Sequence, residues 1–265
     1  MKLILATFVV LMAMASSAVA ASGKRPAPPD ALAVAPAEFT QFTSAELQRG
    51  FLALAFGSDL RIGARPRGIR RFVGPVRAQV IAGGSVARAA AAERIVEEYA
   101  AKIPNLRLSV VTGATADADT ADIEVRLIDE SEFEAALRAA FGIRVARDFI
   151  RRTNPQCMTS VKSAADGAIV RAVTFVIVDK GEEVFRDCAY HELLHAFGLS
   201  NHDQRNPYTT LNQKRMVGYL TVYDRALLTI LYDPRIVPGM TRAQVRKALP
   251  GVISSLRLAA PVRGR

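Results

Sequence analysis

The spacing of apolar residues along the chain predicts several amphipathic helices. Thr43 and Glu46 form a capping box that opens a helix, with Phe42 placed to contact Leu47. Ser85 opens a longer helix with one apolar face, made of Ala92, Ile95, Val96, Tyr99 and Ile103. Two further capping boxes predict a helix from Ser131 to Gly142 and a last helix through Leu249; they are Ser131 with Glu134 and Thr241 with Gln244.

Alternation of apolar and polar residues predicts strands between these helices. Residues 76–80, 106–110 and 123–127 alternate as half-buried strands do. Residues 169–178 are almost continuously apolar and β-branched, which is typical of a strand covered on both faces. The polar, arginine-rich segment 143–166 is interpreted as a loop.

These elements predict one α+β domain at residues 41–252, followed by a C-terminal tail at 253–265. We expect a mixed β-sheet packed against the long helix and a second helix that carries the chemistry, with a short, mostly helical C-terminal part. No internal repeat or low-complexity domain is found, and a second hydrophobic core is not needed at this length.

The N-terminus has the pattern of a signal peptide. Lys2 precedes an apolar run at residues 3–14, and Ala18-Val19-Ala20 provides a cleavage signal. We therefore expect residues 1–20 to be removed and residues 21–40, which are rich in proline, to form a flexible leader. The protein is predicted to be periplasmic or secreted and not transmembrane after cleavage; an uncleaved anchor is the alternative.

The composition excludes wholesale disorder, a collagen-like fibre and a polytopic membrane protein. The chain is 50% hydrophobic and carries 35 Lys+Arg against 25 Asp+Glu. No nucleic-acid-binding motif is present, so we expect no nucleic acid partner. The basic residues are interpreted as part of a solvated surface, or as a surface that weakly attracts anionic envelope components. One cluster of them consists of Arg61, Arg65, Arg67, Arg70, Arg71 and Arg77.

The two cysteines, Cys157 and Cys188, are expected to form a disulfide if the protein is exported to an oxidising compartment. Closing a loop of about 32 residues would stabilise the fold by about 3–4 kcal/mol in the chain-entropy model. Two free buried cysteines are the alternative.

The histidines carry the main functional signal, because all three lie within one twelve-residue window. His191 and His195 are four residues apart in a segment predicted to be helical from about 183 to 197, so both rings project from one face. Two such imidazoles can bind one tetrahedral Zn²⁺. Glu192, next to the first ligand, is placed to act as a general base on a water that the zinc activates.

A third ligand is needed, and His202 is the first candidate. Gly198 can adopt the left-handed conformation that ends a helix and turns the chain back toward the metal. Asp203 is the reserve candidate, since a carboxylate oxygen also suits zinc. The alternative to a metal site is three histidines on the surface or in the core.

The motif His191-Glu192-x-x-His195-x-x-Gly198 resembles the signature of the metzincin zinc peptidases. It departs from that signature at Asn201, where the third histidine of a metzincin would stand. From about residue 155 to 250 the chain also resembles a bacterial family of exported proteins of unknown function that are regarded as zinc metallopeptidases. Beyond the histidine motif, that resemblance rests on Cys188, Leu220-Thr221-x-x-Asp224, Leu231-Tyr232-Asp233-Pro234 and Pro238-Gly239-Met240-Thr241.

The metzincin resemblance implies a metzincin-like fold and a methionine turn beneath the metal. Met216 is the nearer candidate and Met240 the farther, although either could be an ordinary core methionine. A tyrosine could stabilise the oxyanion, and the candidates are Tyr219, Tyr223 and Tyr208.

Two functions are therefore expected. The first is a zinc metallopeptidase of the HExxH type, or an amidohydrolase, that acts on a peptide or protein substrate. The second is a catalytically weak or inactive, metal-stabilised envelope protein that binds anionic polymers or a protein partner. No specificity pocket can be inferred from the sequence.

Overall fold

The structure is a computed structural model that describes residues 42–57, 67–82, 86–111, 121–153 and 155–256. The predicted signal peptide, the leader and residues 257–265 of the predicted tail lie outside these ranges, as do Arg61, Arg65 and Ser85. None of the helices in these ranges has both the length and the apolar character that crossing a membrane requires.

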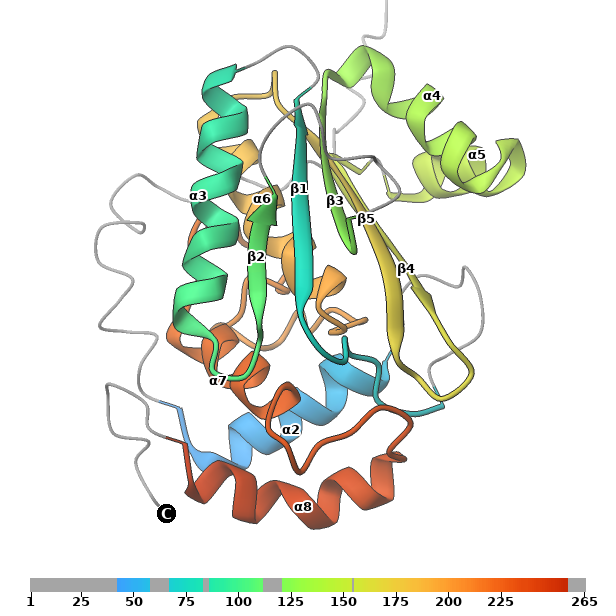
Figure 1. The fold of residues 1–265 in the computed structure, drawn as a ribbon. Helices are drawn as coiled ribbons and strands as arrows, with labels where there is room; N and C mark the ends of the chain where they lie inside the picture. The colour runs from blue at the N-terminus through green and yellow to red at the C-terminus, as the bar shows by residue number, and fades with distance from the viewer. Residues whose placement is uncertain (1–41, 58–66, 83–85, 112–120, 154, 257–265) are drawn as a thin grey trace, which may run out of the picture.

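A five-stranded mixed sheet forms the centre of the molecule (Figure 1). Its spatial order is β2 (Leu108–Val111), β1 (Val76–Ala82), β3 (Ile123–Ile128), β5 (Ile169–Ile177) and β4 (Cys157–Ser163). The first four strands are parallel, and β4 runs antiparallel to β5 at one edge. The predicted α+β fold with a mixed sheet is confirmed.

One face of the sheet is covered by α3 (Val86–Lys102) and α6 (Glu182–Ala196), and α6 lies behind the strands in Figure 1. Ile123, Val125 and Leu127 alternate along β3 toward this face and join the main hydrophobic core. The predicted apolar face of the long helix is buried in the same core. The helix that carries the histidines therefore packs on a rigid sheet.

A second group of helices packs together at the lower end of the sheet in Figure 1. It consists of α2 (Ser44–Phe56), α7 (Val222–Leu231) and α8 (Arg242–Ser254). The capping boxes predicted for α2 and α8 are both present. However, α7 was not predicted, and α8 continues beyond Leu249 with Pro250 inside the helix.

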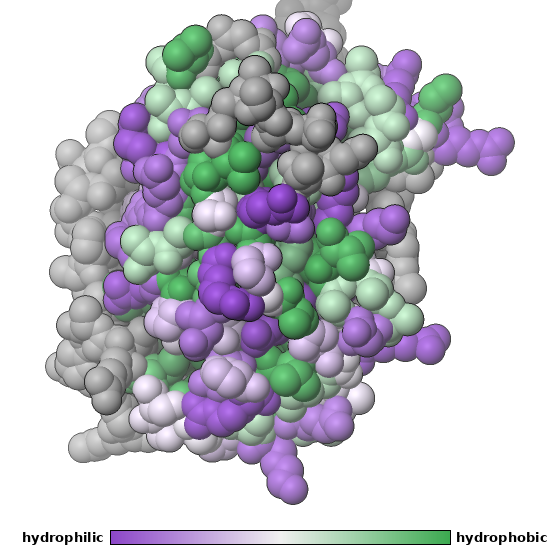
Figure 2. Space-filling model, viewed as in Figure 1, coloured by the Kyte–Doolittle hydropathy of each residue, from purple (hydrophilic) through white to green (hydrophobic). Residues whose placement is uncertain are grey.

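The opposite face of the sheet is partly covered by α4 (Glu130–Phe141) and α5 (Ile143–Thr153), which bury a smaller apolar cluster. Elsewhere on the side viewed in Figure 2, hydrophilic and hydrophobic residues are interspersed. The predicted capping box at Ser131 is wrong, because α4 begins one residue earlier with Asp129 at the N-cap. The backbone N–H of Glu130 instead donates to Asp179 at 3.1 Å.

The interpretation of residues 143–166 as a loop is also wrong, because this segment forms α5 and β4. Ala146 and Ile150 of α5 pack against the smaller cluster, whereas Arg144, Arg147 and Arg151 are exposed. Because α5 carries exposed arginines, its sequence was interpreted as a polar loop and not as an amphipathic helix.

The structure confirms the predicted disulfide between Cys157 on β4 and Cys188 on α6, whose Cα atoms are 5.7 Å apart. The bond ties the edge strand to the histidine helix one turn before His191.

The interpretation of the basic residues as a solvated surface is wrong for Arg71. Its Nη1 donates to three backbone carbonyls at the end of α7 and just after it. These carbonyls belong to Leu231, Asp233 and Ile236.

Candidate metal centre

Helix α6 presents His191 and His195 from the same side, one turn apart. The helix begins after Gly181, whose φ is +94°, and is buried along most of its length. The Tyr99 hydroxyl on α3 donates to the Tyr190 carbonyl at 2.9 Å, which fixes the helix next to the first histidine. The predicted helix at 183–197 is thus confirmed to within one residue at each end.

The chain turns sharply at Gly198, whose φ is +118°. The Cβ atom of any other residue there would collide with the backbone carbonyl of Arg70. The left-handed turn predicted at this glycine is confirmed, and only glycine satisfies both the conformation and the close approach.

Residues after this turn are anchored on the end of α2. The backbone N–H groups of Ser200 and Asn201 both donate to the Leu54 carbonyl, and Asn201 Nδ2 donates to the Ala53 carbonyl at 3.1 Å. The side chain at position 201 therefore points toward α2. The ring of the next residue, His202, approaches His191 instead.

The three histidine rings converge on one point. The Nε2 atom of His191 lies 2.9 Å from that of His202, and His195 Nε2 lies 3.1 Å from each of the other two. Within the described ranges, these rings are the one group of His, Cys, Asp or Glu side chains with the spacing of metal ligands. His191 is buried, whereas His195 and His202 are partly exposed, so the point is open on one side.

Backbone carbonyls determine which nitrogen carries the proton on two of these rings. His191 Nδ1 lies 2.9 Å from the Thr210 carbonyl, and His195 Nδ1 lies 2.5 Å from the Leu199 carbonyl. A carbonyl can only accept, so each Nδ1 is the donor. In the neutral form of each ring the Nε2 lone pair is then free of the proton, and both lone pairs would point at the same place, which is an arrangement that a cation stabilises.

Glu192 is 4% exposed and follows His191 on α6. The Thr159 hydroxyl of β4 donates to the Glu192 backbone carbonyl at 3.0 Å, so the edge strand runs beside this residue.

Asp203, the reserve ligand, is not part of the converging group. Its carboxylate accepts from the backbone N–H of Arg205 at 3.2 Å, as in a local turn. The side-chain amide nitrogen of Gln213, an exposed residue, lies 3.3 Å from His202 Nε2 and borders the open side of the histidine group.

The three candidate tyrosines differ in what their hydroxyls contact. The Tyr223 hydroxyl donates to the Glu46 carbonyl of α2, and the Tyr208 ring packs against both Tyr223 and Phe42. The Tyr219 hydroxyl is buried and makes no hydrogen bond to a described residue. Burial raises the pKa of Tyr219 to about 12, so at neutral pH the hydroxyl keeps its proton and can donate.

Of the two candidate methionines, Met216 precedes a residue that is hydrogen-bonded to α6. The next residue, Val217, donates its backbone N–H to the buried Asp187 carboxylate at 2.6 Å, and Asp187 lies one turn before His191. Met240 instead packs against the main core ahead of α8, and its sulfur accepts from the Val237 N–H.

One acidic residue near the site had no predicted role. Asp224 on α7 is fully buried, and its carboxylate accepts from the Thr209 hydroxyl and the Thr210 N–H. Burial raises the pKa of Asp224 to about 6. The resemblance had included Thr221-x-x-Asp224, but only the fold shows that this carboxylate contacts the segment that binds His191.

Residues 44–251 match a protein family described as being of unknown function, DUF2927. The chain belongs to this family. The predicted membership in a family of unknown function is thereby confirmed, and the family's description assigns no activity. A comparison with curated proteins finds no match.

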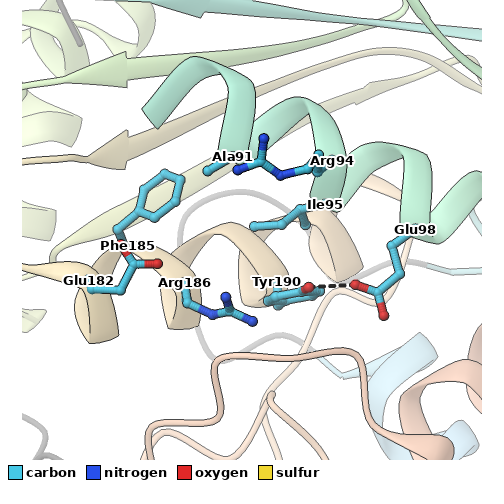
Figure 3. A pocket seen from close by; sticks show the side chains of 8 residues that line it. All are labelled: Ala91, Arg94, Ile95, Glu98, Glu182, Phe185, Arg186 and Tyr190. Carbon is cyan, nitrogen blue, oxygen red and sulfur yellow. Dashed lines mark hydrogen bonds between the residues drawn. The ribbon is translucent and has the colours of Figure 1, made fainter. Parts of the chain in front are cut away.

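A pocket of about 220 Å³ lies between α3 and α6 (Figure 3). Its acidic residues are already paired: Glu98 accepts from the Tyr190 hydroxyl at 2.5 Å, and Glu182 pairs with Arg88. The pocket lacks the histidines and Glu192, and its residues therefore provide control positions for tests of the metal centre.

Replacing Gly198 with Ala is expected to destabilise the protein strongly and to weaken metal binding through His202. A non-glycine residue at this φ costs about 1–3 kcal/mol, and the clash with Arg70 adds to that cost. Gly142→Ala is the matched control, because Gly142 also has a positive φ, of +82°, but has open space around it. Urea unfolding should show the larger loss for Gly198→Ala; equal losses would contradict the role assigned to the close approach.

Proposed function

We propose that the protein is an exported zinc-dependent metallopeptidase that hydrolyses peptide bonds, with Glu192 as general base. The observation that carries the proposal is the convergence of three Nε2 atoms, all 2.9–3.1 Å apart. The rings of His191, His195 and His202 would hold the metal.

The donor set fits zinc in number and spacing. Two nitrogens bound at about 2.0–2.1 Å to one tetrahedral Zn²⁺ lie about 3.3 Å apart, within a few tenths of an ångström of the separations seen here. Three protein ligands with one open position are typical of catalytic zinc sites, whereas structural sites are closed by four. The partial exposure of His195 and His202 supports an open position.

Zinc in this position would polarise the substrate carbonyl and make a water acidic enough to be deprotonated near neutral pH. Glu192 would accept that proton and pass it to the leaving amine. Glu192 is buried directly after His191 on α6, which places it next to the rings that would hold the metal.

A peptide substrate is supported by the position of β4. This strand ends the sheet order, and among the described residues it pairs only with β5. An extended peptide can add to such an edge through backbone hydrogen bonds. Because Thr159 of β4 contacts the Glu192 carbonyl, a peptide bound along this edge would pass close to the general base.

Two further residues are proposed to support the reaction. The Tyr219 hydroxyl, buried and protonated, would donate to the developing oxyanion. Met216, held against α6 by the Val217–Asp187 hydrogen bond, would form the methionine turn.

A second candidate function is an inactive, metal-stabilised protein that binds anionic envelope polymers. The exposed arginines of α5 favour it, and the three that the structure describes are Arg144, Arg147 and Arg151. Such binding would weaken as salt rises, and the metal would produce no turnover.

Removal and return of the metal separates these two functions. The purified protein is expected to hydrolyse a mixed peptide library, to lose that activity on treatment with a chelator, and to regain it with about one equivalent of Zn²⁺ per chain. Turnover that persists without metal would contradict the proposal. Zinc binding without any turnover would favour the second function.

A further inference from the structure

We propose that Asp224 is a positioning residue for the metal centre, which acts by fixing the Thr210 carbonyl that orients the His191 ring. The inference rests on the proposed function, because it concerns a ring that would bind the metal. Asp224 itself touches none of the three histidines in the contacts described above.

A continuous chain of hydrogen bonds joins Asp224 to His191. The Thr210 N–H donates to Asp224 Oδ2 at 2.9 Å, and the Thr209 hydroxyl donates to Oδ1. The Thr210 carbonyl then accepts from His191 Nδ1 at 2.9 Å. One carboxylate thus holds two consecutive residues, and the second of them presents its carbonyl to the histidine.

Asp224 is itself held in place by the start of α7. Its backbone N–H donates to the hydroxyl of the N-cap residue Thr221 at 2.9 Å. The N-terminal turn of a helix favours a negative charge, and α7 is buried in the main core. The carboxylate is therefore held in a fixed position, and its hydrogen bonds hold the loop that contains Thr209 and Thr210.

The loop that carries Thr210 runs from the end of α6 to the start of α7 and contains no helix or strand. Without the Asp224 contacts, the Thr210 peptide plane could rotate and the His191 ring would lose its fixed acceptor. The ring could then carry its proton on Nε2, which cannot bind a metal in that form. Asp224 thereby selects the metal-binding tautomer of His191.

The location of a carboxylate here is energetically costly. Asp224 and Thr209 are fully buried, and a buried carboxylate costs free energy even when it is hydrogen-bonded. A neutral side chain would avoid this cost if the residue served only to pack α7. The carboxylate accepts from the Thr209 hydroxyl through one oxygen and from the Thr210 N–H through the other, whereas an amide side chain offers only one oxygen.

The test compares Asp224→Ala and Asp224→Asn with the wild type in two measurements. The first is zinc affinity, from competition with a chromophoric chelator. The second is the tautomer of His191 in the metal-free protein, from ¹⁵N NMR of the labelled ring. We expect Asp224→Ala to weaken zinc binding about 10- to 100-fold and to increase the Nε2–H form of His191. The asparagine variant should lie between, because its amide oxygen can still accept from the Thr210 N–H.

Glu124→Gln is the matched control. Glu124 is also fully buried, but it lies on β3 on the opposite face of the sheet and pairs with Arg126 and Arg171. Its replacement should lower the free energy of unfolding and leave zinc affinity and the His191 tautomer unchanged.

The possible results are distinguishable. If Asp224→Ala loses stability but binds zinc as tightly as the wild type and keeps the Nδ1–H form of His191, the positioning role is overturned. If the wild type binds no zinc, the proposed function fails, while the tautomer measurement still decides whether Asp224 orients the ring. Should the alanine variant not fold, the asparagine variant provides both measurements.

Discussion

Replacing Glu192 with Gln is expected to remove peptide hydrolysis while leaving metal binding intact. The amide has the size of the carboxylate but cannot accept a proton, and general acid–base catalysis contributes about 10²- to 10⁴-fold to rates. We therefore expect kcat to fall by about a factor of 1,000 with little change in KM, because the residue would act in the transition state rather than in substrate binding. Steady-state kinetics on a peptide substrate, with metal analysis of the same samples, measures both.

The control for this variant is Glu98→Gln. Glu98 lies on α3 in the pocket of Figure 3, where it accepts from the Tyr190 hydroxyl, and an amide oxygen can keep that bond. This variant should retain activity. Undiminished hydrolysis by Glu192→Gln would exclude Glu192 as the general base, and loss of metal from that variant would mean that its carboxylate has a structural role.

Removing the disulfide by replacing Cys157 and Cys188 with Ser is expected to lower the free energy of unfolding by about 3–4 kcal/mol. The two cysteines are 31 positions apart in the sequence. Loss of the bond between them restores conformational freedom to the unfolded chain. It also frees α6 from β4 one turn before His191, so zinc affinity should fall as well. Urea unfolding of the metal-free protein separates the stability effect from metal binding.

Reduction of the wild type provides an internal control for the disulfide. A reductant should shift the wild-type unfolding midpoint toward that of the double variant and leave the double variant unchanged. A wild-type midpoint that is the same with and without reductant would show that the bond does not stabilise the fold.

Local patterns predicted most of the elements whose signals are local, although the capping box at Ser131 did not form. The caps at Thr43 and Thr241 depend on residues three positions apart, and both formed as expected. The segment at 143–166 could not be assigned in this way, because β4 exists through its pairing with β5 and its bond to α6. Arginines on the exposed side of α5 hid an apolar face that only packing against α4 and β5 reveals.

The residues of the candidate site likewise include some that local spacing predicts and others that only the fold brings together. Spacing within one helix was sufficient to place His191 and His195 together. The approach of His202 depends on Asn201 binding the end of α2, which is about 150 residues earlier in the chain. The carbonyl of Thr210 and the carboxylate of Asp224 reach the site only through the fold, so no motif around the histidines could have indicated them.

The three histidines are proposed to form one metal site, and the metal content of the purified protein is the direct test of that site. The purified wild-type protein, analysed by elemental mass spectrometry after dialysis, should contain about one zinc per chain. Single replacements of His191, His195 or His202 by Ala should each reduce that content strongly while the protein stays folded. A wild type that remains free of metal when zinc is supplied, or a His202→Ala variant that keeps its full complement, would show that the three histidines do not form this site.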